Sequence, residues 1–249
     1  MYKIPKRLNR EPLIEVIWQV RFEPKPDTSV GDLLPGVLYS ALKTSHPGIL
    51  LHPLPTVSIP APVAQLDANL RYAAKYRLED PESRFLYQIG DRFLTMNCRK
   101  PYVGWERFKD RLLVLIKTLE DSGLVPTPLH HSLRYIDLLT LDPAPDVSAL
   151  QLVLEIGQHA VVSQPLQLRM EMSDDPFTHV VQIATPAEAR LPEGLTKGTI
   201  IDLESFNMQP PTDWGAIRAQ IDPLHDRSKA VFFQKLLTAE AISKLEPEY

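Results

Sequence analysis

The feature that most constrains the fold is a short motif that occurs twice, 119 residues apart. Residues 23–29 (EPKPDTS) and 142–148 (DPAPDVS) both combine an acidic residue, two alternate prolines and an aspartate. Apolar residues on both sides match at the same offset: Ile17, Val20, Phe22, Leu33 and Leu34 meet Ile136, Leu139, Leu141, Leu152 and Val153. Such a motif is also ordinary stop-and-turn chemistry, which leaves chance similarity as the alternative. The flanking matches favour an internal duplication.

The first half predicts the order strand, helix, three strands, helix. Strand 13–22 alternates apolar and polar residues, and helix 29–45 should become regular at Pro35, because proline fits a first helical turn. The proline-rich residues 49–66 read as an extended connection. The remaining elements are strands 70–78, 84–89 and 92–98, with a Gly90-Asp91 hairpin turn, and a helix over 104–119 that ends before Gly123.

The second half predicts the same order of elements. A strand over 131–142 precedes a short helix, Ser148 to Ile156, and three strands follow at 164–172, 177–185 and 197–207. Helical sequence then runs from Asp213 to Leu245, with a break expected near Asp222-Pro223. Its first residues continue the repeat, because Trp105, Phe108 and Leu112 match Trp214, Ile217 and Ile221 at an offset of 109.

The predicted class is therefore α+β, built from two duplicated β-α-β-β-β-α halves, residues 1–123 and 124–249. We expect the halves to form one continuous unit, an antiparallel sheet with helices on one face, because a single shared core buries more apolar surface. This layout resembles the saddle of TATA-binding-protein-like folds. That analogy concerns the fold and implies no function.

Composition narrows the classes of function. The chain has 249 residues, 44% hydrophobic and 23% charged, which is typical of a folded globular protein. Its formal charge is −4, so the whole molecule does not attract nucleic acid or acidic membranes strongly. One cysteine excludes a disulfide framework and fits a reducing compartment. With no apolar run of membrane length and no signal peptide in the basic residues 1–10, we expect a cytoplasmic protein.

Four stretches of sequence are similar to one known family. They are PLIEVIWQVRF at 12–22, KPYVGWERF at 100–108, LRYID at 133–137 and the terminal helix around Leu224, Phe232 and Leu237. Together they resemble a sporadically distributed family of prokaryotic proteins of about this length, to which no activity or cofactor is assigned. The resemblance implies a full-length intracellular protein in a mobile or defence-associated context.

Basic residues on the predicted strand 70–78 and its neighbours form the first candidate site. Cations interleaved with Tyr87 or Phe93 on a helix-free sheet face would suit a phosphate-bearing ligand such as single-stranded nucleic acid. The alternative is an ordinary surface that Glu79, Asp80 and Glu82 balance. The candidate ligand-binding residues are Arg71, Lys75, Arg77, Arg84 and Arg92.

Asp202, Glu204 and His225 are secondary candidates. The two carboxylates fall on one strand face at the two-residue period, a spacing that can hold a metal or support hydrolysis, although the sequence indicates no third ligand. His225 follows Asp222 by three residues in helical sequence and could do acid–base chemistry or brace the helix. Cys98 is expected to be a buried structural thiol, and His130-His131 the end of a loop.

No phosphate-binding loop, dinucleotide fingerprint, nucleophile elbow or zinc-protease helix occurs, and only ten glycines are present. The leading hypothesis is therefore a non-catalytic binding or regulatory protein that needs no cofactor and acts through a protein partner. Nucleic-acid or phosphate-ligand binding on the basic face is the alternative, and a metal-dependent hydrolase is a distant third. Exposed sheet edges make a homo-oligomer a further possibility.

Overall fold

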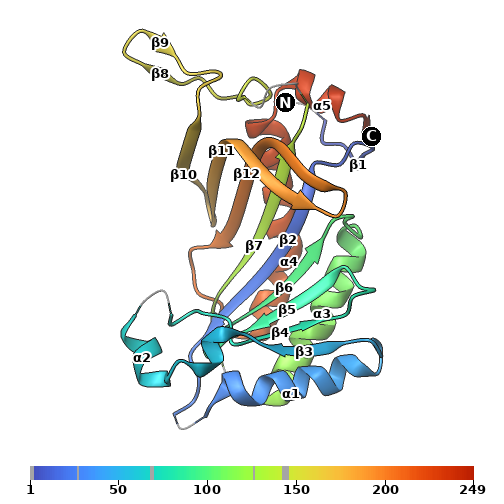
Figure 1. The fold of residues 1–249 in the computed structure, drawn as a ribbon, viewed down its shortest axis with the longest axis vertical. Coiled ribbons are helices and arrows are strands. Elements are labelled where there is room, and N and C mark those ends of the chain that lie inside the picture. The colour runs from blue at the N-terminus through green and yellow to red at the C-terminus, as the bar shows by residue number, and fades with distance from the viewer. Residues whose placement is uncertain (1–2, 27, 68–69, 126, 142–145) are drawn as a thin grey trace. The chain divides into compact units, whose positions relative to one another are not determined.

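The computed structural model describes the whole chain except residues 1–2, 27, 68–69, 126 and 142–145 (Figure 1). The fold is α+β with a large antiparallel sheet, as the sequence predicts. The helices are α1 (Val30–Lys43), α2 (Ala61–Leu66), α3 (Trp105–Ser122), α4 (Trp214–Val231) and α5 (Ala239–Lys244). A 3-10 turn at Pro55–Ser58 precedes α2, and a π-helical turn at Phe232–Leu236 lies between α4 and α5.

Nine strands form the sheet in the order β10-β11-β12-β7-β2-β6-β5-β4-β3. Two small ladders, β1 with β13 and β8 with β9, stand apart from it. The strand bounds are β1 Arg7–Leu8, β2 Leu13–Phe22, β3 Leu50–Pro53, β4 Tyr76–Glu79, β5 Phe85–Ile89, β6 Phe93–Arg99, β7 Pro128–Leu139, β8 Glu155–Ile156, β9 His159–Ala160, β10 Leu166–Asp174, β11 Phe177–Leu191, β12 Gly194–Asn207 and β13 Pro247–Glu248.

Contacts divide the chain into two compact units. Unit 1 comprises residues 1–15, 134–206 and 222–249, and unit 2 comprises 16–133 and 207–221. The predicted boundary between residues 123 and 124 is a boundary of the sequence repeat and stays a prediction. The same holds for the duplication itself, since residues 142–145 of its second motif lie outside the described residues.

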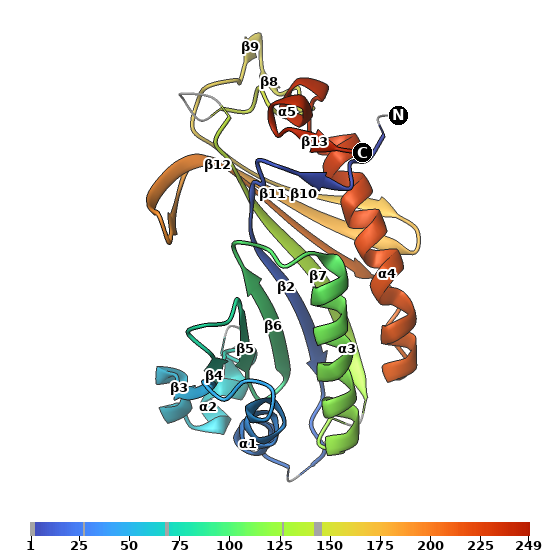
Figure 2. The ribbon, with the colours of Figure 1, turned by 90° about the vertical axis from the view of Figure 1, so that its right-hand side faces the viewer.

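In unit 2, the strands are covered by α1 and α3, which contact each other (Figure 2). Strand β2 buries Val16, Trp18, Val20 and Phe22 at every second position, which confirms the predicted alternation. Helix α3 buries a stripe at helical spacing: Phe108, Leu112, Leu115, Ile116 and Leu119. It ends at Gly123, whose φ of 63° lies in the left-handed region that glycine adopts without strain.

In unit 1, strands β7, β11 and β12 contribute to a core that the C-terminal segment covers. Ile201 and Leu203 on β12 pack with Phe232, Phe233 and other apolar side chains between positions 231 and 245. Asp202 and Glu204 alternate with these residues along β12. They therefore face the opposite side of the sheet, as the two-residue period requires.

The predicted strand 70–78 is only half correct. Pairing with β3 and β5 begins around Lys75 and Tyr76, whereas the N–H groups of Arg71 and Ala73 bond to Asp67 and Leu70 in a turn. Alternation of apolar and polar residues imitated a strand there, although Ala73 and Ala74 have little preference for one. The connection at 49–66 is also more structured than predicted, since it contains β3, the 3-10 turn and α2.

The predicted helix at 148–156 is wrong. The Asp146 side chain accepts hydrogen bonds from the Ser148 N–H and hydroxyl, and the Gln151 N–H bonds to Leu236 instead of a preceding turn. Backbone groups that find partners outside the segment no longer need a helix. A small β8–β9 hairpin occupies its end.

Both proline-based boundaries are wrong as well. Helix α1 begins at Val30 and contains Pro35, and α4 passes through Pro223 without a break. The break comes later, at Leu237, where the backbone is extended with φ −89° and ψ 140°. A proline costs a helix one hydrogen bond, which packing of the surrounding helix can outweigh.

Candidate functional site

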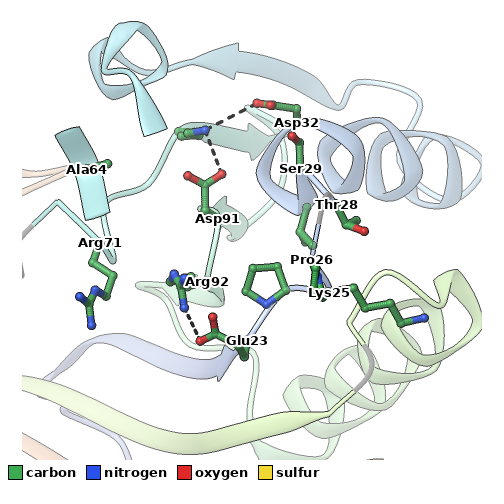
Figure 3. A pocket seen from close by; sticks show the side chains of 13 residues that line it. Glu23, Lys25, Pro26, Thr28, Ser29, Asp32, Ala64, Arg71, Asp91 and Arg92 are labelled. Atoms are coloured by element: carbon green, nitrogen blue, oxygen red, sulfur yellow. Dashed lines mark hydrogen bonds and ion pairs between the residues drawn. The ribbon is translucent and has the colours of Figure 1, made fainter. Parts of the chain in front are cut away.

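A cavity of about 640 Å³ opens in unit 2 at the N-terminal end of α1 (Figure 3). The residues after β2 form one wall, the first turn of α1 another, and the turns before β4 and β6 complete it. Charged side chains of both signs line it: Glu23, Lys25, Asp32, Arg71, Lys75, Asp91 and Arg92. Three of the five predicted ligand-binding residues, Arg71, Lys75 and Arg92, therefore share one cavity.

Lys75 is the centre of an ion-pair cluster in this cavity. Its Nζ lies 2.8 Å from Asp91 Oδ1 and 3.7 Å from Asp32 Oδ1, and its side chain is mostly buried. Burial opposes the charged form, but the hydrogen bond and charge of Asp91, with the charge of Asp32, raise the pKa of Lys75 overall. The ammonium group of Lys75 is thus protonated, and the carboxylates of Asp91 and Asp32 balance its charge.

The other cations of the cavity differ in their surroundings. Arg92 forms an ion pair with Glu23, as the dashed line in Figure 3 shows. Lys25 is directed away from Arg92, and its Nζ lies 3.5 Å from the Gly123 carbonyl oxygen. Arg71 is exposed and extends along the opposite wall.

The remaining two predicted cations lie outside the cavity lining. Arg77 pairs with Glu79, with Nη2 2.9 Å from Oε1, and Arg84 is exposed at the start of the β5–β6 hairpin. The structure thus separates the predicted set into two groups. Whether either binds a ligand stays a prediction.

Gly31 lets the first turn of α1 approach Asp91 closely. A Cβ atom at this position would lie 2.3 Å from Asp91 Oδ1, so any larger residue would displace the carboxylate that holds Lys75. This contact joins residues 60 positions apart in sequence, and no local pattern marks it.

Asp202 in unit 1 is held by Arg134 of β7 in a two-pronged ion pair. Arg134 Nε lies 2.6 Å from Oδ1, Nη2 bonds to Oδ2, and Gln182 Nε2 lies 3.4 Å from the same Oδ2. The hydrogen bond to Asp202 raises the pKa of Arg134 despite partial burial. Both oxygens of the predicted carboxylate are therefore occupied by a cation within the chain.

The other secondary candidates do not join Asp202 in a metal site. Among the described residues, no three histidine, cysteine, aspartate or glutamate side chains gather closely enough to hold an ion. His225 instead meets Tyr135 of β7, with Nδ1 2.6 Å from the phenol oxygen, a partner that the sequence did not indicate. Cys98 is buried, as predicted.

A serine, a histidine and an aspartate from β12, β11 and β10 lie close together in unit 1. Ser205 Oγ is 2.7 Å from His179 Nδ1, and His179 Nε2 is 3.6 Å from Asp174 Oδ2. Burial lowers the pKa of His179 although Asp174 favours its charged form. The order of groups resembles a hydrolase triad. Both Ser205 and His179 are inaccessible to solvent, so a substrate has no route to the hydroxyl, and the group ties β11 to β12.

Two more titratable groups are buried and are not among the residues that line the cavity at the N-terminal end of α1. His131 is held by Gln220, with Nε2 2.9 Å from Oε1, and burial lowers the pKa of His131 to about 4. Asp137 is fully enclosed in unit 1, where burial, followed by the charges of Glu11 and Asp202, raises its pKa well above the ordinary value. The sequence pattern does not predict the burial of Asp137, because an aspartate on a strand normally faces water.

The outer face of α1 in unit 2 carries exposed apolar side chains. Leu34, Leu38 and Leu42 are buried, yet the residues between them are also uncharged. Leu33 and Val37 are 52% and 37% exposed. We define the outer face as the exposed residues that lie between the exposed charges of Asp32 and Lys43: Leu33, Gly36, Val37, Ser40 and Ala41.

Comparison of the sequence with protein-family models and with curated proteins gives no match. The family resemblance therefore stays a prediction. Within the described parts of the chain, no helix combines the length and apolar character that crossing a membrane requires.

Proposed function

We propose that this protein binds another protein and that the outer face of α1 is its principal contact. The observation that carries the proposal is that Leu33 and Val37 are exposed on a helix that has no charged side chain between Asp32 and Lys43. Its charged residues, Asp32 and Lys43, lie near its two ends. A surface helix normally carries charged or polar residues along its solvent face, so this uncharged stretch with exposed Leu33 and Val37 suits contact with a partner.

Helix α3 provides an internal comparison. It lies in the same unit, and its exposed positions are mainly charged: Glu106, Arg107, Asp110, Lys117, Glu120 and Asp121. That is the ordinary pattern of a helix with one solvated face. Val114 is the exception, an isolated exposed valine of the kind that needs no partner. The two helices therefore differ in what their outer faces are suited to meet.

The chemistry of the face favours a helix of a partner protein. Gly36, Ser40 and Ala41 are small, so a second helix could approach closely between Leu33 and Val37, since interaxial distance depends on the side chains at the contact. A lipid surface fits less well, because helices that lie on membranes carry many lysines or arginines beside their apolar face, and α1 has one lysine.

Introducing a charge into this face tests the proposal. The variant Val37→Glu should retain less than a tenth of the partner that the wild-type chain captures from its own cells, because a buried unpaired carboxylate costs several kcal/mol. Glutamate has a higher helix propensity than valine, so the fold should be unaffected. The captured protein is identified by mass spectrometry, and the complex is then formed again from purified components.

Val114→Glu is the matched control, because it makes the same substitution at an exposed valine of the other helix. It should capture as much partner as the wild type. Equal capture by the two variants, or loss of capture by both, contradicts the assignment of the contact to α1. Failure of the wild-type chain to capture any partner contradicts protein binding itself.

The cavity at the N-terminal end of α1 favours a second function, binding of a phosphate-bearing ligand such as a nucleic-acid strand. Four cations line it, which supports the alternative hypothesis from the sequence. Three carboxylates line it too, and they engage Lys75 and Arg92, so only a small excess of positive charge remains. We therefore rank this function second.

A titration with fluorescent single-stranded DNA tests the second function. Arg71→Ala, inside the cavity, should weaken binding about tenfold, whereas Arg84→Ala removes an exposed arginine outside the cavity and should have little effect. Binding should also fall steeply as salt rises. Equal effects of the two substitutions, or no binding at low salt, would exclude the cavity as the binding site.

A further inference from the structure

Strand β10 is an unprotected edge of the sheet in unit 1. Its nine residues pair one to one with β11, from Leu166 opposite Thr185 to Asp174 opposite Phe177, without a bulge. No strand of the described chain pairs with its other side (Figure 1). Proteins usually protect such edges with short strands, prolines, bulges or lysines. β10 contains none of these features.

The opposite edge of the sheet shows the usual protection. Strand β3 has only four residues, and the last of them is Pro53, which cannot donate a ladder hydrogen bond. Of the two edge strands of this sheet, β10 therefore leaves the longer row of backbone groups exposed. An edge of nine residues offers a second strand a full set of backbone partners.

We propose that β10 pairs antiparallel with β10 of a second copy of this chain, about a two-fold axis at Met170. The central residues 167–173 (QLRMEMS) are complementary to themselves in this register, whereas the end pair places Leu166 opposite Asp174. Arg169 of each copy lies opposite Glu171 of the other, Leu168 lies opposite Met172, and Gln167 lies opposite Ser173. Opposite charges and apolar pairs directly across from each other stabilise neighbouring strands.

Charge selects this register over its neighbours. A two-fold axis perpendicular to the sheet must place one residue of β10 opposite the same residue of the second copy. The reason is that facing side chains have to lie on the same side of the sheet. Moving the axis to Arg169 places two arginines opposite each other, and moving it to Glu171 places two glutamates opposite each other. Like charges in facing positions are destabilising. An axis at Met170 alone among these three avoids them.

The two sides of β10 support the same arrangement. Leu168 and Met172 pack against the core of unit 1, and Met170 between them is 38% exposed. A second β10 would bring another Met170 against it and continue the apolar row. On the other side, Arg169 and Glu171 are 58% and 57% exposed and pair with each other, Nη2 to Oε1 at 2.9 Å. They are free to exchange that contact for one across the axis.

Charge reversal tests the pairing in the full-length chain. Sedimentation velocity over a range of concentrations should show the wild type forming dimers, and Arg169→Glu should dissociate at least tenfold more readily, because glutamates then face each other. The double variant Arg169→Glu/Glu171→Arg restores opposite charges and should dimerise as the wild type does. Both side chains are exposed, so neither variant threatens the fold.

Cross-linking tests the register. Met170→Cys should form a disulfide between two copies under mild oxidation, because residues facing each other across the axis have Cβ atoms about 4.5–5.5 Å apart. Arg169→Cys and Glu171→Cys should each cross-link poorly alone and well when mixed. Cys98 is buried and does not compete.

The outcomes decide the proposal. A wild-type chain that is monomeric at every concentration overturns it, and so does a dimer that Arg169→Glu leaves unchanged. A dimer in which Arg169→Cys cross-links to itself better than Met170→Cys does overturns the register. Dimerisation restored by the double variant, with the Met170→Cys cross-link, supports both.

Discussion

Asp137 is a carboxyl group in a place that disfavours its charge. It lies on β7, enclosed by unit 1, where the charges of Glu11 and Asp202 act on it in addition to burial. Both burial and like charge favour the protonated acid, so its pKa in the folded chain lies well above the 3.8 of a solvated aspartate. Between those two pKa values, the folded chain holds one proton more than the unfolded chain.

The variant Asp137→Asn should therefore gain stability relative to the wild type as pH rises. The wild type loses about 1.4 kcal/mol per pH unit in the window above pH 3.8, because unfolding releases the proton, whereas asparagine cannot titrate. Urea unfolding of both chains at pH 4 and pH 8 measures the difference. Parallel stability curves for the two chains would show that Asp137 is not held protonated.

Buried polar residues are the part of the structure that the sequence indicated least. Arg134 meets Asp202 across 68 positions, and His179 meets Ser205 across 26, so each contact depends on strand pairing that no local pattern specifies. The sequence did place Asp202 and Glu204 on one face, because the two-residue period is a local property. It could not show that an arginine occupies that face.

At the scale of elements, two glycines illustrate opposite uses of the same residue. Gly123 ends α3 in the left-handed region, and Gly36 lies within α1 at an ordinary helical position. A Cβ atom would meet nothing within 4 Å at either position. Only the backbone conformation distinguishes them.

Alanine substitutions should therefore change stability in opposite directions. Gly36→Ala should raise the free energy of unfolding by about 0.5–1 kcal/mol, because it reduces the freedom of the unfolded chain. Gly123→Ala should lower it by about 1–2 kcal/mol, because an L side chain strains a left-handed residue. Chemical denaturation of the two variants gives both values. Shifts of the same sign would contradict the helix end at Gly123.

Elements with a strong, long periodicity were predictable, and those defined by prolines were not. The alternation of 13–22 and the stripe of α3 gave strands and helices with nearly correct ends. Pro35 and Pro223 suggested boundaries that do not exist, because tertiary packing can hold a helix around a proline. The segment 148–156 failed for a related reason: its backbone bonds to residues near 236, which are remote in sequence.

At the scale of the whole molecule, the two proposed surfaces belong to different units. The outer face of α1 lies in unit 2 and β10 lies in unit 1. They differ in chemistry too, because α1 offers uncharged side chains and β10 offers backbone groups with a self-complementary charge pattern. We therefore propose self-pairing and partner binding as separate events.

The contact between α1 and a partner protein is the central claim, and photo-cross-linking in living cells tests it most directly. A photoreactive amino acid is placed at position 33, 37 or 41 on α1, and at position 114 on α3 as the control. We expect a single partner to be linked from all three α1 positions and not from position 114. Linkage from position 114 alone, or no linked protein at any α1 position, would contradict the account.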